Sequence, residues 1–245
     1  MSTVIPTEPG SGDGSLFPPT LWSAISAARS DDAPRALAGL ERLARAYWRP
    51  LYIFVRQRGQ DHERAADLVQ GFFAHLLTRD FLRELRPSAG RFRSFLLVAF
   101  RRWLRDLNVQ ENALKRGGGR ATVPLDALEE MRLEPVAAEA DPETAFDRAW
   151  AQGVFDRAFR ALKDDWAHRS ELFAALRLSL EGRLDAESYA DLATRLGMTE
   201  GAVKKAAFDL RRQFAERVRA EIRSTVHDDA EVEDELRHLV ALLRR

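Results

Sequence analysis

The chain has 245 residues, of which 45% are hydrophobic and 31% charged, and its 38 basic and 38 acidic side chains leave no formal net charge. The absence of cysteine excludes disulfides, thiol nucleophiles and cysteine-ligated zinc. There is no signal-peptide pattern and no apolar run of membrane-spanning length, so the sequence predicts a cytoplasmic protein without a membrane partner. Ala, Leu, Arg and Glu dominate and β-branched residues are scarce, which predicts an all-α fold.

The N-terminal part of the chain predicts a leader followed by amphipathic helices. Residues 1–19 are rich in Gly, Pro, Ser and Thr and predict a disordered leader. Apolar spacing then predicts a helix over 20–28 and a second over 34–49. We expect a break near Pro50 and a continuation that ends at Gly59.

Asp61 is the predicted N-cap of the next helix, which runs to about Leu77. Its apolar stripe is wider than one buried face requires, which indicates either burial between several helices or a face shared with a partner. A short amphipathic turn is predicted over 81–85, and the sequence Pro-Ser-Ala-Gly over 87–90 separates it from the central segment.

The central segment, residues 91–119, combines one apolar helix face with a local excess of positive charge. The apolar face carries Phe92, Phe95, Leu96, Ala99, Phe100, Trp103, Leu104 and Leu107. The cations are Arg91, Arg93, Arg101, Arg102, Arg105, Lys115 and Arg116, opposed only by Asp106 and Glu111. Such a pattern suits an unpaired nucleic-acid strand, because cations follow phosphates and rings stack on bases. A core helix with a solvated basic face explains the same periodicity.

Residues 117–141 predict a flexible linker and the boundary between two small helical domains, residues 20–116 and 142–227. The glycine run 117–119 has the wrong order for a phosphate-binding loop. Asp141 is a predicted N-cap with Pro142 in the first turn of the following helix. A further helix is predicted over 171–180.

Two helices joined by Gly197-Met198-Thr199 have the spacing of a helix-turn-helix. Thr199 is the predicted cap of the second helix, which runs from Glu200 to about 222. The residues expected to pack the pair together are Ala193, Leu196, Val203 and Leu210. Those expected to face outward are Lys204, Lys205, Phe208, Arg211 and Arg212. A helical hairpin without DNA contacts would show the same pattern.

The amphipathic tail, 228–245, is expected to fold back onto the second domain, and a partner-docking helix is the alternative.

Taken together, these segments resemble the extracytoplasmic-function (ECF) group of bacterial sigma-70 family sigma factors. The resemblance covers most of 20–222. It rests on Asp67-Leu-Val-Gln70-Gly-Phe-Phe73, on Arg91-Phe-Arg-Ser-Phe-Leu-Leu97 with the following Arg101 to Asp106, and on Tyr189-Ala-Asp-Leu-Ala193, Leu196-Gly-Met-Thr199 and Glu200-Gly-Ala-Val-Lys204. The order, the spacing and the intervening linker all agree with the family.

The resemblance implies a non-enzymatic factor that binds core RNA polymerase, at the clamp and flap of its large subunits, and directs promoter-specific transcription initiation. The first domain would resemble sigma region 2 and the second sigma region 4. The implied polymerase contacts are Asp61, Glu63, Asp67, Gln70 and Phe73. The implied −10 element contacts are Arg91, Arg93, Arg101, Arg102, Trp103, Arg105, Asn108, Lys115 and Arg116. The implied −35 element contacts are Thr199, Glu200, Lys204, Lys205, Phe208, Arg211 and Arg212.

Some positions depart from the family pattern. Arg64, Ala66 and Gly71 stand where carboxylates are common in the polymerase-binding helix. Ala206 and Asp209 stand where basic residues are frequent in the recognition helix, so we expect weaker and less salt-dependent −35 binding.

Two other functional classes account for less of the sequence. A dimeric helix-turn-helix regulator that binds duplex DNA without polymerase explains the second domain but not the first. A helical enzyme is disfavoured because the five histidines have no metal-ligand spacing and no nucleophile–base pattern, so no cofactor, metal or catalytic residue is predicted. The histidines are His62, His75, His168, His227 and His238. An anti-sigma factor or Ser/Thr kinase is left open as a regulator; the docking helix has no Ser or Thr before Thr78.

Overall fold

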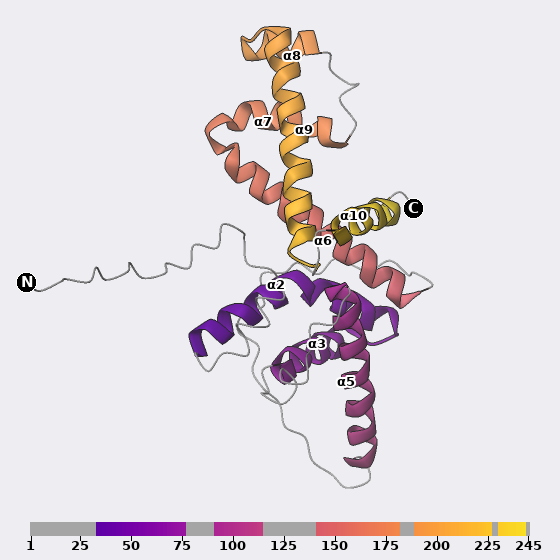
Figure 1. The fold of residues 1–245 in the computed structure, drawn as a ribbon. Coiled ribbons are helices and arrows are strands. Elements are labelled where there is room, and N and C mark those ends of the chain that lie inside the picture. The colour runs from indigo at the N-terminus through magenta and orange to yellow at the C-terminus, as the bar shows by residue number, and fades with distance from the viewer. Residues whose placement is uncertain (1–32, 77–90, 115–140, 182–188, 227–229, 244–245) are drawn as a thin grey trace, which may run out of the picture.

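The computed structural model describes residues 33–76, 91–114, 141–181, 189–226 and 230–243 (Figure 1). All the regular elements in these ranges are helical, which confirms the all-α prediction. They are α2 (Ala33–Gln57), α3 (His62–Leu76), α5 (Phe92–Leu114), α6 (Pro142–Asp165), α7 (Ser170–Leu176), α8 (Tyr189–Leu196), α9 (Glu200–Arg223) and α10 (Ala230–Leu243), with short 3-10 helices at Ala167–Arg169 and Arg177–Glu181. Among these helices, none has the length and apolar character needed to cross a membrane.

Several predicted elements lie outside the described residues. They are the leader (1–19), the helix at 20–28, the turn at 81–85 and the linker up to residue 140.

Helix starts follow the predicted capping residues. The Arg64 N–H donates to Asp61 Oδ1 at 2.8 Å before α3. Asp141 accepts hydrogen bonds from the Thr144 hydroxyl and from the backbone N–H groups of Thr144 and Glu143 at the start of α6, and these bonds hold the pKa of its carboxyl below the usual range. Thr199 Oγ1 accepts from the Ala202 N–H at 3.2 Å at the start of α9. Each cap satisfies a backbone donor that the helix leaves free.

The predicted break near Pro50 is wrong, because α2 continues through it as one 25-residue helix. Proline inside a helix loses one backbone hydrogen bond and costs about 3 kcal/mol. Tyr47, Leu51 and Phe54 on either side are almost completely buried. Burying side chains of this size stabilises by about 1.5–3 kcal/mol each, so tertiary packing offsets the local cost.

One hydrophobic cluster connects the first part of the chain to the second. It contains side chains of α2, α3 and α5, but also Phe146, Trp150 and Val154 of α6, Ile222 of α9 and Val232 of α10. The largest helix–helix interface joins α2 to α6. The two predicted domains, 20–116 and 142–227, are therefore packed against one another in this structure. The expected folding of the tail onto the second domain is confirmed, because α10 packs on α6 and α9.

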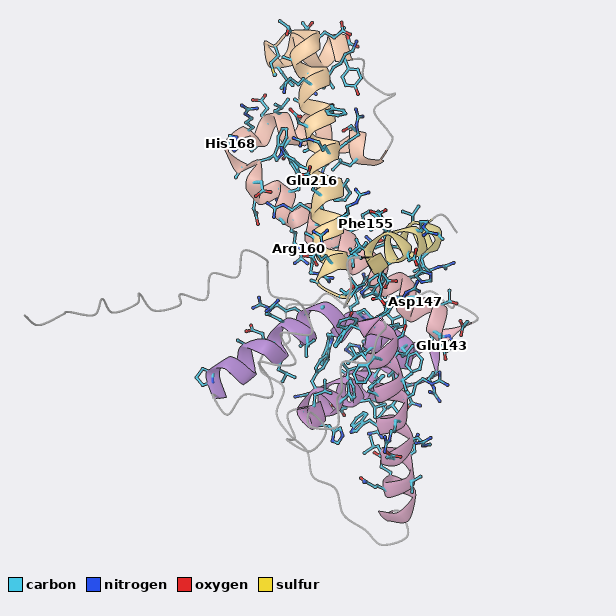
Figure 2. The ribbon with its side chains drawn as sticks, viewed as in Figure 1. Glu143, Asp147, Phe155, Arg160, His168 and Glu216 are labelled. Atoms are coloured by element: carbon cyan, nitrogen blue, oxygen red, sulfur yellow. The ribbon has the colours of Figure 1, made fainter. Side chains whose placement is uncertain are left out.

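A second cluster lies at the other end of the molecule. It joins the C-terminal half of α6 to α7, α8 and the N-terminal half of α9 through residues such as Leu162, Phe173 and Val203. Figure 2 shows α6 passing from Glu143 and Asp147, beside α5, to the segment around His168 in this second cluster. As a result, α5 and α8 lie at opposite ends of the molecule (Figure 1).

Gly71 allows α3 and α5 to approach closely. A Cβ built at this position would lie 3.2 Å from two ring atoms of Trp103. The indole also packs against Phe72 and Phe100, with ring centroids 5.7 and 6.0 Å apart. Gly71 stands where the family resemblance leads one to expect a carboxylate. The close packing of Trp103 explains why a residue without a side chain is found there.

We predict that Gly71→Ala will not bring the gain of up to about 1 kcal/mol that a glycine-to-alanine change gives at an unobstructed helix position. The added methyl displaces the indole of Trp103, which offsets the gain in helix propensity. The matched control is Gly201→Ala in α9, where nothing lies within 4 Å of the new Cβ. Urea denaturation followed by tryptophan fluorescence measures both changes, and equal stabilisation by the two would contradict the close packing.

Candidate nucleic-acid interface

The turn between α8 and α9 has the hydrogen bonding that makes a compact helix-turn-helix. Gly197 has φ +63°, a conformation that L side chains rarely adopt. The Met198 N–H donates to the Ala193 carbonyl at 2.9 Å, and the Gly197 N–H donates to the Thr194 carbonyl at 3.3 Å. This is a Schellman ending, which satisfies the last carbonyls of α8 and reverses the chain into α9.

The inner face of this hairpin is as predicted. Ala193, Val203 and Leu210 are buried, and Leu196 packs against them at the margin. The five residues expected to face outward are all exposed: Lys204, Lys205, Phe208, Arg211 and Arg212. Phe208 is 61% exposed, which is unusual for an aromatic side chain without a partner.

Most of the cations on this face of α9 form ion pairs with acidic neighbours. Lys204 Nζ lies 2.6 Å from Glu200, which raises the pKa of Lys204 above its usual value. Lys205 lies 3.2 Å from Asp209, and Arg212 contacts Asp209 and Glu216. Exposed pairs of this kind contribute little to stability and are screened by salt, so the cations can exchange to phosphate oxygens.

The middle of α5 presents the second cationic face. Arg101, Arg102, Arg105 and Asn108, all implied −10 contacts, are exposed there. Arg101 pairs with Glu143 of α6, and Arg105 lies 3.6 Å from Asp106. Two large apolar side chains share this surface, since Val98 is 65% and Val109 66% exposed.

A groove runs between the middle of α5 and the turn that follows α2. Its volume is about 390 Å³, and a shallower hollow of about 600 Å³ lies beside it. Arg58, Arg101 and Arg105 line both of them. Arg58 was not predicted as a site residue, because it lies outside the basic run of the central segment. Gly59, with φ +82°, turns the chain at that point and leaves Arg58 at the groove.

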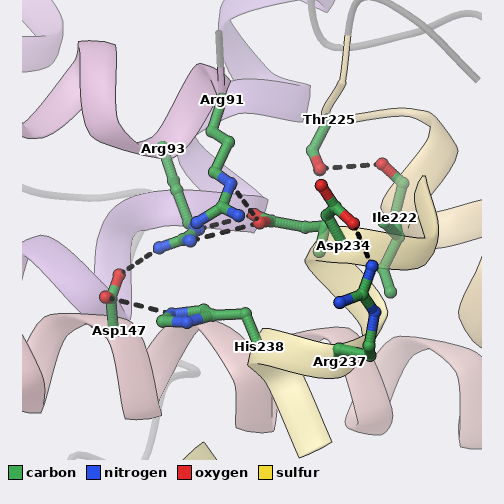
Figure 3. A network of polar contacts seen from close by, with 9 residues as sticks. Arg91, Arg93, Asp147, Ile222, Thr225, Asp234, Arg237 and His238 are labelled. Atoms are coloured by element: carbon green, nitrogen blue, oxygen red, sulfur yellow. Dashed lines mark hydrogen bonds and ion pairs between the residues drawn. The ribbon is translucent and has the colours of Figure 1, made fainter. Parts of the chain in front are cut away.

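Arg91 and Arg93 are held by carboxylates of other helices, as Figure 3 shows. Arg93 is 3% exposed and donates to Glu235 of α10 at 2.6 and 3.2 Å and to Asp147 of α6 at 2.6 Å. Its guanidinium also lies 4.9 Å from the Trp150 ring centroid. Arg91 Nε lies 2.8 Å from Glu235, which is itself 1% exposed. A DNA contact from Arg93 therefore requires α10 to move, whereas the side chain of Arg91 keeps 38% of its surface exposed.

In this network the two positive charges of Arg91 and Arg93 are balanced by the two negative charges of Glu235 and Asp147. Burial alone would lower the pKa of Arg93, but hydrogen bonds and ion pairs with Glu235 and Asp147 outweigh burial and raise it. His238 Nε2 of α10 lies 3.4 Å from the second oxygen of Asp147. The Phe92 N–H donates to the Thr225 carbonyl at 3.3 Å, which adds a backbone bond between the start of α5 and the end of α9.

The residues predicted to contact polymerase divide into two groups. Asp61, Glu63 and Asp67 are exposed along the N-terminal part of α3, and Gln70 is half-buried. Phe73 is 6% exposed and stacks on Trp48, with ring centroids 6.2 Å apart. Its side chain is therefore part of the core in this structure.

Trp103, a predicted base-stacking residue, is partly buried against α3. Lys115 and Arg116 lie outside the described residues. Among the described residues, no group of three or more His, Cys, Asp or Glu side chains is arranged to hold a metal ion. Comparison of the chain with protein-family models, with curated proteins and with solved structures finds no match.

We predict that Glu235→Ala lowers the free energy of unfolding by about 3–5 kcal/mol, because it leaves buried arginine charge without its partner. The matched control is Glu233→Ala in the same helix. Glu233 pairs with Arg219 at 3.1 Å, but both side chains are exposed, so the loss should stay below about 1 kcal/mol. Chemical denaturation measures both. Similar small losses for the two variants would contradict a structural role for the network.

Proposed function

We propose that this protein is a sigma factor of the ECF type, which binds core RNA polymerase and directs promoter-specific transcription initiation. The observation that carries the proposal is the presence of two separate cationic helix surfaces, on α5 and α9, at opposite ends of one chain. A factor that reads two promoter elements needs two such surfaces. A simple helix-turn-helix hairpin gives no reason for the first.

On this proposal, α9 enters the major groove at the −35 element. Thr199, Glu200 and Lys204 are exposed at its N-terminal turn, although Val203 of the same turn is buried against α8. Recognition helices contact base edges with residues near their N-terminus. Glu200 and Lys204 are therefore the candidates for base contacts, while Lys205, Arg211 and Arg212 would position the helix on phosphates.

The exposed half of α5 would engage the −10 element. Arg101, Arg102, Arg105 and Asn108 supply cationic and polar groups on one surface. Trp103 faces α3 rather than solvent, so we assign stacking to it only if the helix pair opens. The proposal does not depend on Arg93, which Asp147 of α6 and Glu235 of α10 hold in the interior, or on Arg91, which pairs with Glu235.

The exposed carboxylates of α3 would orient the protein on core polymerase. Asp61, Glu63 and Asp67 give one end of this helix a negative surface, although Arg64 lies among them and pairs with Glu111 of α5 at 2.5 Å. Charge complementarity of this kind sets orientation and association rate more than affinity. A sigma factor acts in the cytoplasm, with promoter DNA and polymerase as partners and without a cofactor.

A dimeric helix-turn-helix regulator is the second candidate function, favoured by the well-formed turn between α8 and α9. It would bind duplex DNA tightly without polymerase and would prefer a palindromic site. An anti-sigma factor or a Ser/Thr kinase is the candidate regulator under the sigma-factor proposal.

The test is co-purification of the chain with core RNA polymerase, followed by run-off transcription from defined promoters. We expect a stable complex that initiates at specific sites. The double change Glu63→Lys and Asp67→Lys should weaken the complex about tenfold or more by charge reversal at the docking surface. Both residues are exposed, so the fold should be unaffected.

Glu41→Lys is the matched control, because Glu41 is an exposed carboxylate of α2 that is paired with Arg45 outside the docking surface. It should leave the polymerase complex unchanged. Tight duplex binding with no polymerase association would contradict the proposal and favour the dimeric regulator.

A further inference from the structure

The groove between α5 and the turn after α2 has a lining that is basic at its rim and apolar at its base. Its basic residues are Arg58, Arg64, Arg101 and Arg105, and Arg102 joins them in the adjoining hollow. The base is formed by the buried side chains of Val55, Leu68 and Leu104. No carboxylate lines either space, although Glu111, Asp106 and Glu143 pair with lining arginines from outside.

The arginines converge from two helices and a turn, so the concentration of charge is a property of the fold. Arg101, Arg102 and Arg105 project from α5, Arg64 from α3, and Arg58 from the turn after α2. Arg58 has its guanidinium 5.5 Å from the Phe54 ring centroid, a contact that leaves its N–H donors available. Like charges gathered in this way repel one another, and a bound polyanion relieves the repulsion.

We propose that this groove binds the sugar–phosphate backbone of a nucleic-acid strand and that Arg58 is one of its phosphate contacts. Guanidinium groups recognise phosphate oxygens through paired N–H donors, and several of them in a row suit a repeating anion. The exposed Val98 and Val109 lie on the same stretch of α5 and offer apolar contact to sugars.

The stretch from Val98 to Val109 is about 16 Å long at 1.5 Å per helical residue. Each strand of a duplex has one phosphate per about 3.4 Å of the helix axis, and neighbouring phosphates lie farther apart along the backbone itself, so this length covers a few consecutive phosphates. The groove therefore fits a run of backbone rather than a single phosphate. This inference rests on the proposed function and extends it, because it adds α2 to the DNA-binding surface.

The experiment measures binding of the full chain to short labelled single-stranded and duplex DNA, without polymerase, across a salt series. It uses a Lys204→Ala/Arg211→Ala background so that α9 contributes little. We expect Arg58→Ala to weaken binding about fivefold and to lower the slope of log K against log salt by about one. Preference for single-stranded or duplex DNA identifies the form of the strand.

Arg45→Ala is the matched control, since Arg45 is an exposed arginine of α2, the helix that precedes Arg58, and lies outside the groove. It should change binding less than twofold. Arg58→Lys, which keeps the charge but loses the paired donors, should fall between Arg58→Ala and the parent. Circular dichroism checks that the variants fold.

Three outcomes would overturn the inference: no DNA binding by the parent chain, binding that is unaffected by Arg58→Ala, or equal losses at positions 58 and 45. These outcomes are separable from failure of the sigma-factor proposal. If the chain binds DNA through Arg58 but never associates with polymerase, the groove inference stands and the sigma-factor proposal fails. If the chain associates with polymerase but Arg58→Ala has no effect on DNA binding, the sigma-factor proposal stands and the groove inference fails.

Discussion

The buried guanidinium of Arg93 is the interaction on which the arrangement of the helices depends. It joins α5 to Glu235 of α10 and Asp147 of α6, and it lies over the ring of Trp150. Buried ions are stable only where every charge is matched, so this geometry fixes the three helices relative to one another. The hydrophobic cluster that runs through them follows from the same fixed arrangement. With Arg93 held in this network, the exposed cations of α5 are Arg101, Arg102 and Arg105.

Local features of the chain could be predicted from the sequence, because their causes lie within a few residues. The capping residues Asp61, Asp141 and Thr199 and the turn at Gly197 all form hydrogen bonds with near neighbours. Long-range contacts could not be predicted in this way. The basic run identifies Arg93 as charged, but its partner lies 142 residues later in the chain.

The lack of information on long-range contacts also explains the other differences between the sequence-based predictions and the structure. An apolar stripe does not tell which ring is core, so Phe73 was assigned to a docking surface although it stacks on Trp48. Propensity alone placed a break at Pro50, where packing keeps α2 continuous. Arg58 belongs to no basic run, and only the turn at Gly59 brings it beside α5. The exposed residues of α9 were identified correctly because the hairpin that displays them is local.

The proposed function requires one chain to contact DNA at two separate places while it is bound to polymerase. The sequence contains no cysteine, so a single cysteine introduced at Val109 or at Phe208, both exposed, can carry an iron chelate that cuts nearby DNA. In a complex with core polymerase and a promoter fragment, we predict cutting at two distinct sites, one from each position, and both dependent on polymerase. Cutting from position 208 alone, symmetric about a palindrome and independent of polymerase, would contradict the claim.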